Sequence, residues 1–243
     1  MRTLIYIPVI HTSADLGSLA KDVTKRGIAD LGEDIWEKHI AAVEKFWDVI
    51  SGYFDSIDVS GKKIYQDGMV ADGEVGQRIV EESAKSGSRN YELVARLLKK
   101  GAILVKTEDF KLVKEERDRL VAVMQSKSIT HKLIAFIKYK FTKDRLLNNR
   151  DKFIAKRIDE SLSHDEIGII FIGAYHNIKK CLPKSISVSE IKDARIVKEY
   201  QRLLPFCHKN KVRFEELSRY LISKPEGNGL ASGSQSHKAE GQI

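Results

Sequence analysis

Two histidines that directly follow apolar, β-branched segments are the first candidates for chemistry in this 243-residue chain. His11 comes after Thr3–Ile10, and His176 comes shortly after Ile167–Ile172. An imidazole can bind a divalent metal ion or act as a general acid or base near neutral pH. A lone histidine at a strand end is more often a hydrogen-bonded structural group, but two such histidines favour a shared site.

Acidic residues occupy comparable positions. Asp67 follows the apolar segment Lys62–Gln66, and Asp15 lies soon after His11. A carboxylate beside two imidazoles can complete a metal site or assist in proton transfer. Other interpretations stay open, because Asp67 is followed by a glycine typical of a turn, and Asp15 can orient His11 or cap a helix. Glu108 fits best as a first-turn partner of the dipole of a helix that begins at Thr107.

The elements that must position these residues alternate between strands and helices. Continuous apolar runs predict strands that are covered on both faces, as in a parallel sheet. The predicted strands are Thr3–Ile10, Lys62–Gln66, Ala102–Lys106, Ile167–Ile172 and the shorter Ser185–Val188. The predicted helices are Glu33–Ile50, Gly76–Lys100 with a break at Ser86-Gly87-Ser88, Thr107–Met124, Ser128–Leu162 as one helix or two, Ala194–Leu204 and Lys211–Ile222.

This alternation predicts an α/β protein with a mostly parallel central sheet, flanking helices and a helical C-terminal extension. We expect a single domain over residues 1–223 and a disordered, Gly/Ser-rich tail over residues 224–243. Ligands of open α/β sheets bind outside the carboxyl ends of the strands. We therefore expect one edge of the sheet to hold the polar residues that follow four of these strands: His11 to Asp15, Gln66 and Asp67, Thr107 to Asp109, and His176 and Asn177.

Several functional classes are excluded by missing motifs. The glycines have neither dinucleotide-fingerprint nor P-loop spacing, and no G-x-S-x-G, C-x-x-C or H-E-x-x-H motif occurs. Two cysteines form no disulfide framework and suit a reducing compartment, which predicts a cytoplasmic protein. No run of about 18 uncharged apolar residues occurs, so no membrane span is expected.

The net charge of +8 is concentrated in the second half of the chain. Residues 1–127 carry 20 basic and 21 acidic side chains, whereas residues 128–223 carry 20 basic and 11 acidic ones. The stretch Lys132–Arg157 holds nine basic residues interleaved with aromatic ones. Such a pattern suits phosphate contacts and base stacking, so nucleic-acid binding is an alternative function. A solvated helix face whose aromatic residues pack in the core is the simpler interpretation.

The order of these motifs resembles the TraB/Tiki superfamily, whose relatives include erythromycin esterase and ChaN-like proteins. The late motif Gly173-Ala174-Tyr175-His176 matches the G-x-x-H of that group, and Arg150 is placed like its helix-borne arginine. The early motif departs, because Pro8 stands where glycine is expected before His11. The second strand also departs, since it ends in Gln66 and Asp67 rather than glutamate. The resemblance implies metal-assisted hydrolysis, an activity of some members.

The leading hypothesis is therefore a hydrolase that acts on a small-molecule or peptide substrate. His11, His176, Arg150 and Asp67 are the catalytic candidates; Asp15, Tyr175 and Asn177 are the substrate-binding candidates. His11 and His176 are the candidate ligands of a divalent metal ion, and Arg150 is expected to hold an anionic group. A ligand-sensing module without catalysis is a further alternative. The amphipathic helices near the C-terminus allow a homo-oligomer, and the sequence leaves the substrate and the metal open.

Overall fold

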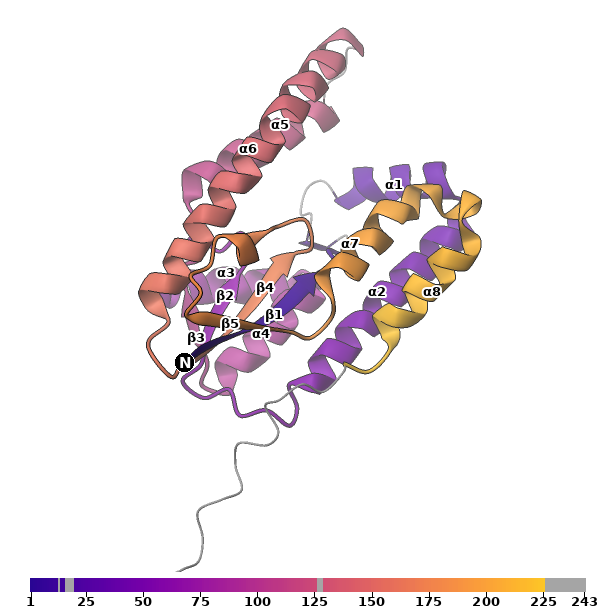
Figure 1. The fold of residues 1–243 in the computed structure, drawn as a ribbon. Coiled ribbons are helices and arrows are strands. Elements are labelled where there is room, and N and C mark those ends of the chain that lie inside the picture. The colour runs from indigo at the N-terminus through magenta and orange to yellow at the C-terminus, as the bar shows by residue number, and fades with distance from the viewer. Residues whose placement is uncertain (13, 16–19, 126–128, 226–243) are drawn as a thin grey trace, which may run out of the picture.

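The computed structural model describes residues 1–12, 14–15, 20–125 and 129–225, and its centre is a five-stranded parallel sheet (Figure 1). The strands are β1 (Arg2–Val9), β2 (Lys63–Gln66), β3 (Ile103–Val105), β4 (Ile167–Gly173) and β5 (Ile186–Glu190). Their order across the sheet is β3-β2-β4-β1-β5, and every pair is parallel. All five predicted strands are present, and the predicted α/β fold is confirmed.

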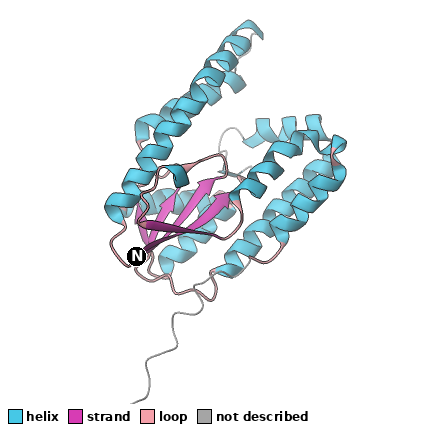
Figure 2. Ribbon diagram, viewed as in Figure 1, coloured by secondary structure: helices cyan, strands magenta, loops and turns pink. Residues whose placement is uncertain are grey.

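Helices cover both faces of this sheet (Figure 2). Within the described residues they are α1 (Ala20–Leu31), α2 (Glu33–Tyr53), α3 (Gly73–Lys85), α4 (Arg89–Lys99), α5 (Phe110–Gln125), α6 (Ile129–Ser161), α7 (Ala194–Leu203) and α8 (Lys211–Ile222). Short 3-10 turns occupy Ile178–Lys180 and Leu204–Lys209. The predicted break between α3 and α4 is confirmed, and Ser88 caps α4 by accepting a hydrogen bond from the Tyr91 N–H. Of the predicted stretch Ser128–Leu162, residues Ile129–Ser161 form one helix, α6.

Alternate residues of β1 supply two separate cores, since successive side chains of a strand point to opposite faces. Ile5 and Ile7 pack in the core that contains Phe46 and Trp47 of α2 and buried residues of α3 and α4. Leu4 and Tyr6 pack in the core that contains Ile154 and Ile158 of α6. Burial on both faces explains why these strands are continuously apolar.

Helices α5 and α6 form an antiparallel arm that projects beyond the rest of the chain (Figure 1). With 33 residues, α6 is long enough to span about 50 Å. From Leu146 onward its buried side chains belong to the body of the protein, whereas Phe141 is 82% exposed. The base of the arm is therefore part of the sheet's core, and the rest extends away from it.

The predicted start of the helix after β3 is wrong. The sequence places its cap at Thr107, but α5 begins at Phe110, and Asp109 Oδ1 accepts hydrogen bonds from the N–H groups of Lys111 and Leu112 at 2.8 and 3.1 Å. Thr107 instead joins two strands, donating to the Val105 carbonyl and accepting from the Gln66 N–H. This shift leaves Glu108 outside the helix, fully buried at the sheet edge.

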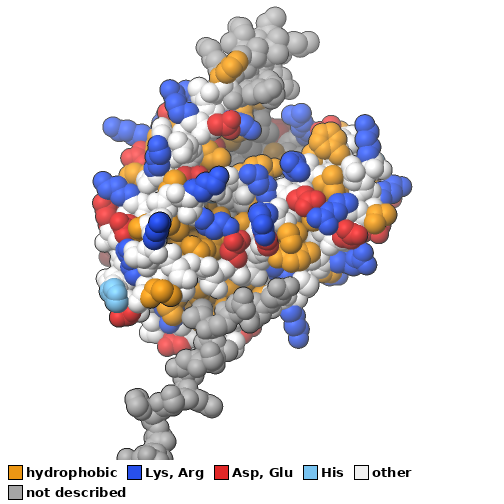
Figure 3. Space-filling model, viewed as in Figure 1, with side chains coloured by type: hydrophobic (Ala, Val, Ile, Leu, Met, Phe, Trp, Pro, Cys, Tyr) orange, Lys and Arg blue, Asp and Glu red, His pale blue; other side chains and the backbone are white. Residues whose placement is uncertain are grey.

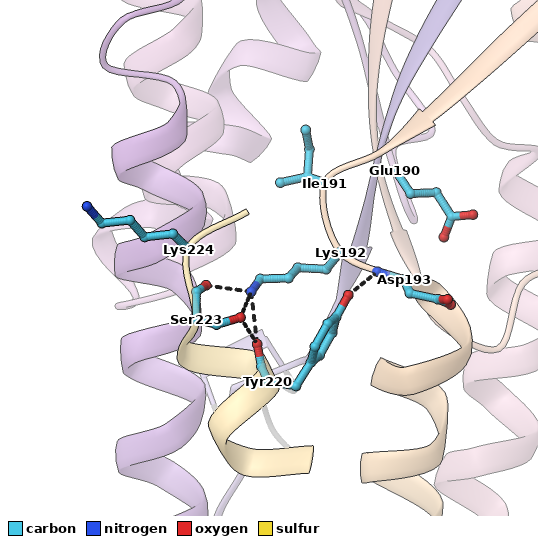
Figure 4. A pocket seen from close by; sticks show the side chains of 7 residues that line it. All are labelled: Glu190, Ile191, Lys192, Asp193, Tyr220, Ser223 and Lys224. Atoms are coloured by element: carbon cyan, nitrogen blue, oxygen red, sulfur yellow. Dashed lines mark hydrogen bonds between the residues drawn. The ribbon is translucent and has the colours of Figure 1, made fainter. Parts of the chain in front are cut away.

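The C-terminal helices α7 and α8 are present as predicted, and a buried lysine anchors them (Figure 4). Lys192 is 2% exposed, and its Nζ donates to the carbonyl oxygens of Tyr220 and Ser223 at 2.9 and 2.5 Å. The Tyr220 hydroxyl in turn accepts from the Asp193 N–H at 2.7 Å. A cation at the last carbonyl groups of a helix is favoured by the helix dipole. This contact therefore fixes the end of α8 to the end of β5.

Among the described residues, no helix combines the length and the hydrophobicity that crossing a membrane requires. The expected disorder over 224–243 concerns residues that, from 226 onward, lie outside the described part of the chain. The expected single domain over 1–223 stays a prediction.

The contact between α2 and α7 makes the stability of the protein depend on pH. His39 is buried, and its Nδ1 lies 2.9 Å from the Tyr200 hydroxyl. Burial lowers the pKa of His39 to about 4, from an ordinary value of 6.5. The unfolded chain therefore binds a proton at His39 more readily than the folded chain does. The stability that the neutral His39 gives the folded state is complete above pH 6.5 and is lost as the pH falls toward 4. We expect His39 to remove at most about 1.4 kcal/mol of unfolding free energy per pH unit in this window.

Urea denaturation at several pH values, compared between the wild type and His39→Gln, measures how much of the pH dependence of the unfolding free energy comes from His39. Glutamine does not titrate, so the variant should lose stability less steeply between pH 6.5 and 4. Equal slopes for the two proteins would show that His39 is not the responsible group.

Candidate functional site

The strand order brings His11, Asp67 and His176 together at the carboxyl edge of the sheet. Because β4 lies between β2 and β1, the loop of His176 lies between Asp67 and His11. The His176 Nε2 is 3.5 Å from Asp67 Oδ2. A Cβ atom placed on Gly173 would lie 3.1 Å from Asp67 Oδ2 and 4.0 Å from His11 Nε2. All three side chains therefore lie close to Gly173.

His176 is held in one orientation by Asp151 of α6. Its Nδ1 lies 2.6 Å from Asp151 Oδ1, and Asp151 Oδ2 accepts a hydrogen bond from the Asn177 N–H at 2.9 Å. This pairing leaves Nε2 directed at Asp67. Burial works against a charged imidazole, but Asp67 and Asp151 outweigh it and raise the pKa of His176 above its ordinary value. A carboxylate on one ring nitrogen is the usual way in which proteins fix a metal-binding histidine.

His11 forms a looser pair of the same kind with Asp15. Its Nδ1 is 3.8 Å from Asp15 Oδ2, and its side chain is 46% exposed. Asp15 is itself fixed by the Thr12 N–H at 2.6 Å and by the Ser88 hydroxyl. Partial removal from water opposes the charged ring, but Asp15 and Asp67 raise the pKa of His11. Ser88, the N-cap residue of α4, therefore holds the carboxylate of Asp15 that faces His11.

Asp67 lies beside His176 as an ionised carboxylate. Its Oδ2 accepts a hydrogen bond from the Gly173 N–H at 2.9 Å, and its Oδ1 accepts one from Arg150 Nη2 at 2.6 Å. Burial alone would raise the pKa of Asp67, but His176 and Arg150 lower it far below its ordinary value. The carboxylate beside His176 is therefore negatively charged.

Arg150 of α6 is engaged by three carboxylates. Besides Asp67, its Nε donates to Glu108 Oε2 at 2.8 Å, its Nη2 donates to Glu108 Oε1, and its Nη1 donates to Glu116 Oε2. Glu108 also accepts from the Gly68 N–H at 3.1 Å. Burial raises the pKa of Glu108, although Arg150 opposes this rise. The guanidinium was expected to hold an anionic group of a substrate, but its described contacts direct it to Asp67 and Glu108.

The site carries more negative than positive charge. Five carboxylates with little exposed area surround it, and Arg150 is the one guanidinium or ammonium in their described contacts; they are Asp15, Asp67, Glu108, Glu116 and Asp151. One ligand atom each of Asp67, Glu108 and His176 lie within 4.8 Å of one another. His11 is not in this group. Arg150 bridges Asp67 Oδ1 and Glu108, so Asp67 Oδ2, which lies 3.5 Å from His176 Nε2, is the oxygen of Asp67 that has no described contact with Arg150. Nitrogen and carboxylate ligands of this type suit zinc, manganese and iron.

The two residues that flank His176 lie at the rim. Tyr175 is 46% exposed, and Lys198 Nζ lies 5.0 Å from the centre of its ring. The exposed Asn177 contributes its backbone N–H to Asp151. Tyr175 and Asn177 are therefore placed to meet a substrate outside the metal-binding groups, and that role stays a prediction.

Asp151 and Glu116 are not among the residues predicted from the sequence, and Glu108 is predicted there only as a first-turn partner of a helix dipole. A sequence signal for the burial of Arg150 does exist. Arg150 occupies the buried stripe of α6 that repeats every fourth residue through Leu146, Ile154 and Ile158. A charged residue on such a stripe needs buried partners of opposite charge.

The basic stretch Lys132–Arg157 does not form one free face. Arg150 belongs to the site, and Arg157 Nε donates to the Lys106 carbonyl at 3.3 Å. On the face in Figure 3, basic side chains are spread among acidic and hydrophobic ones. The side chains of residues 132–138 and of Lys140 lie outside the described part of the structure. Nucleic-acid binding stays a prediction.

Comparisons with protein-family models, with curated proteins and with solved structures found no significant match for this chain. The resemblance to the TraB/Tiki superfamily therefore stays an expectation, and the functional argument depends on the geometry of the site.

The charge network predicts a large effect on stability from one substitution. Arg150→Met removes the cation that Asp67 and Glu108 share, and uncompensated buried carboxylates cost about 3–5 kcal/mol. We expect the unfolding free energy to fall by this amount in denaturant titrations at pH 7.

Adding Glu108→Gln to Arg150→Met should recover part of the loss, because the second change removes one unpaired charge. Arg145→Met, which alters an exposed arginine of the same helix, serves as the control and should stay within about 0.5 kcal/mol of the wild type. Equal losses in Arg150→Met and Arg145→Met would contradict the network.

Proposed function

We propose that this protein is a metal-assisted hydrolase in which His11 Nε2, His176 Nε2 and Asp67 Oδ2 hold a divalent metal ion. The observation that carries the proposal is the pair of carboxylate–imidazole contacts, Asp151 with His176 and Asp15 with His11. In both, the carboxylate lies on the Nδ1 side of the ring. His176 Nε2 then lies 3.5 Å from Asp67 Oδ2, and His11 Nε2 lies 4.0 Å from the Cβ position of Gly173. Histidine ligands in metal sites are oriented in this way.

The charge balance supports a cation at this position. Asp67 is ionised and accepts from Arg150 through Oδ1, so its Oδ2 is left for the imidazole side. Two neutral imidazoles and one carboxylate form a ligand set that leaves coordination positions open. Glycine at position 173 keeps a side chain from crowding these groups, because a Cβ there would lie 3.1 Å from Asp67 Oδ2.

When bound, a divalent ion polarises a substrate carbonyl and makes water a nucleophile at neutral pH. The chain's own residues orient and hold these groups. Asp151 fixes the ring of His176, and Arg150 keeps Asp67 ionised and in place. The exposed His11 lies on the side from which a small-molecule or peptide substrate would approach, with Tyr175 at the rim.

Further proposals concern the family, the cellular location and an alternative function of the protein. The resemblance to the TraB/Tiki superfamily points to the same chemistry. The free cysteines Cys181 and Cys207 fit a reducing compartment, so we propose a cytoplasmic location. A ligand-sensing module could use the same site, and ligand binding without hydrolysis of ester or amide compounds would favour it.

Metal content tests the proposal directly. We expect the wild-type protein, incubated with zinc, manganese or cobalt and freed of excess ion, to retain about one ion per chain. His11→Ala and His176→Ala each remove a ligand and should weaken binding at least tenfold, as measured by calorimetry and elemental analysis. His164→Ala, which changes an exposed histidine away from the site, is the matched control. Equal occupancy in the wild type and the His11→Ala/His176→Ala double variant would disprove the metal site.

The space at Gly173 gives a second test. A methyl group there would lie 3.1 Å from Asp67 Oδ2, so Gly173→Ala should push this oxygen away from the imidazoles. We expect metal binding to weaken about tenfold while the fold is retained. Gly52→Ala is the control, because a Cβ at Gly52 meets no atom within 4 Å. Unchanged affinity in Gly173→Ala would place the metal elsewhere.

A further inference from the structure

In its described contacts, Glu116 of α5 is connected to Asp67 through Arg150, by a different nitrogen of the guanidinium from the one that contacts Asp67. Its Oε2 accepts from Arg150 Nη1, whereas Asp67 Oδ1 accepts from Nη2 at 2.6 Å. The Glu116 side chain is 18% exposed, so this contact is partly shielded from water. Sequence reasoning gave no role to Glu116.

The planar shape of the guanidinium group allows the contact with Glu116 to influence the orientation of the whole Arg150 head group. A guanidinium is a rigid plane with five N–H donors, so fixing one edge fixes the direction of the others. Glu108 holds the edge formed by Nε and Nη2, and Glu116 holds Nη1. The second hydrogen on Nη2 is then directed at Asp67.

We propose that Glu116 is a positioning residue of the site, which orients Arg150 and thereby holds Asp67 against His176. This inference rests on the proposed function for its effect on metal binding. The inference also connects the arm formed by α5 and α6 to the site. Glu116 and Arg150 come from its two helices, so a displacement of α5 relative to α6 reaches Asp67 through two consecutive ion pairs.

The neighbouring residue on α5 provides a matched comparison. Glu115 pairs with Arg119 one turn along the same helix, at 2.7 Å, and has no described contact with Arg150. Glu115→Gln and Glu116→Gln therefore remove the same charge from adjacent positions of one helix. Only the second change alters the partners of Arg150.

The experiment measures the dissociation constant for Mn²⁺ or Zn²⁺ by calorimetry in the wild type, Glu115→Gln and Glu116→Gln. We expect Glu116→Gln to weaken metal binding roughly 5- to 50-fold, the range typical of groups that orient metal ligands. Glu115→Gln should stay within about twofold of the wild type. Thermal unfolding of the metal-free proteins checks that both variants are folded. Equal affinities for the two variants would overturn the positioning role.

A second measurement does not require a metal. The NMR signals of the Arg150 guanidinium report its rotation, which the three carboxylates should slow in the wild type and in Glu115→Gln. We expect faster rotation in Glu116→Gln. If the wild type binds no metal but rotation accelerates in Glu116→Gln alone, the hold of Glu116 on Arg150 stands and the proposed hydrolase function fails. Unchanged rotation in Glu116→Gln would overturn the inference itself.

Discussion

The carboxyl edge of the sheet depends on a buried excess of negative charge that the protein must compensate. Taking a carboxylate out of water costs several kcal/mol, even after the surroundings relax. Backbone N–H groups of Gly68, Gly173 and Asn177 offset part of this cost, and Arg150 offsets more by sharing one guanidinium among three acids. Protonation of the imidazoles reduces the remaining negative charge, and a bound divalent ion would reduce it as well. The same arrangement therefore limits stability and, under the proposed function, favours a bound cation.

The fold meets this constraint through strand order. With β4 between β2 and β1, three loops that are far apart in the sequence end side by side. Pro8, which departs from the expected glycine, fits the same order. The pairing of β1 with β5 ends at Tyr6 and Glu190, so a residue without a backbone N–H is tolerated beyond that point. Asp67, rather than the preceding Gln66, is the acidic residue that faces the imidazoles. Pro8 and Asp67 are therefore both compatible with the observed geometry of this edge.

The elements could be predicted from sequence because each has a strong local signal, such as the continuous apolar run of β4 or the stripe of α2. The gathering of His11, Asp67 and His176 followed from one rule on parallel sheets. The partners of these residues could not be found in this way. Asp151 and Glu116 lie on helices, where polar residues are common, and only the packing of α6 shows that they face inward. Glu108 was misassigned because a shift of three residues in a helix start decides whether a carboxylate caps a helix or enters a core.

The two imidazoles differ in a way that fits unequal tasks. Asp151 lies 2.6 Å from His176, which is buried, whereas Asp15 lies 3.8 Å from His11, which is 46% exposed. A buried, tightly paired imidazole keeps its geometry when a ligand arrives, because moving it would break a hydrogen bond in a medium of low dielectric constant. An exposed, loosely paired one can shift at small cost. Under the proposed function, His176 and Asp67 therefore define where the metal lies, and His11 is the ligand that adjusts as substrate enters.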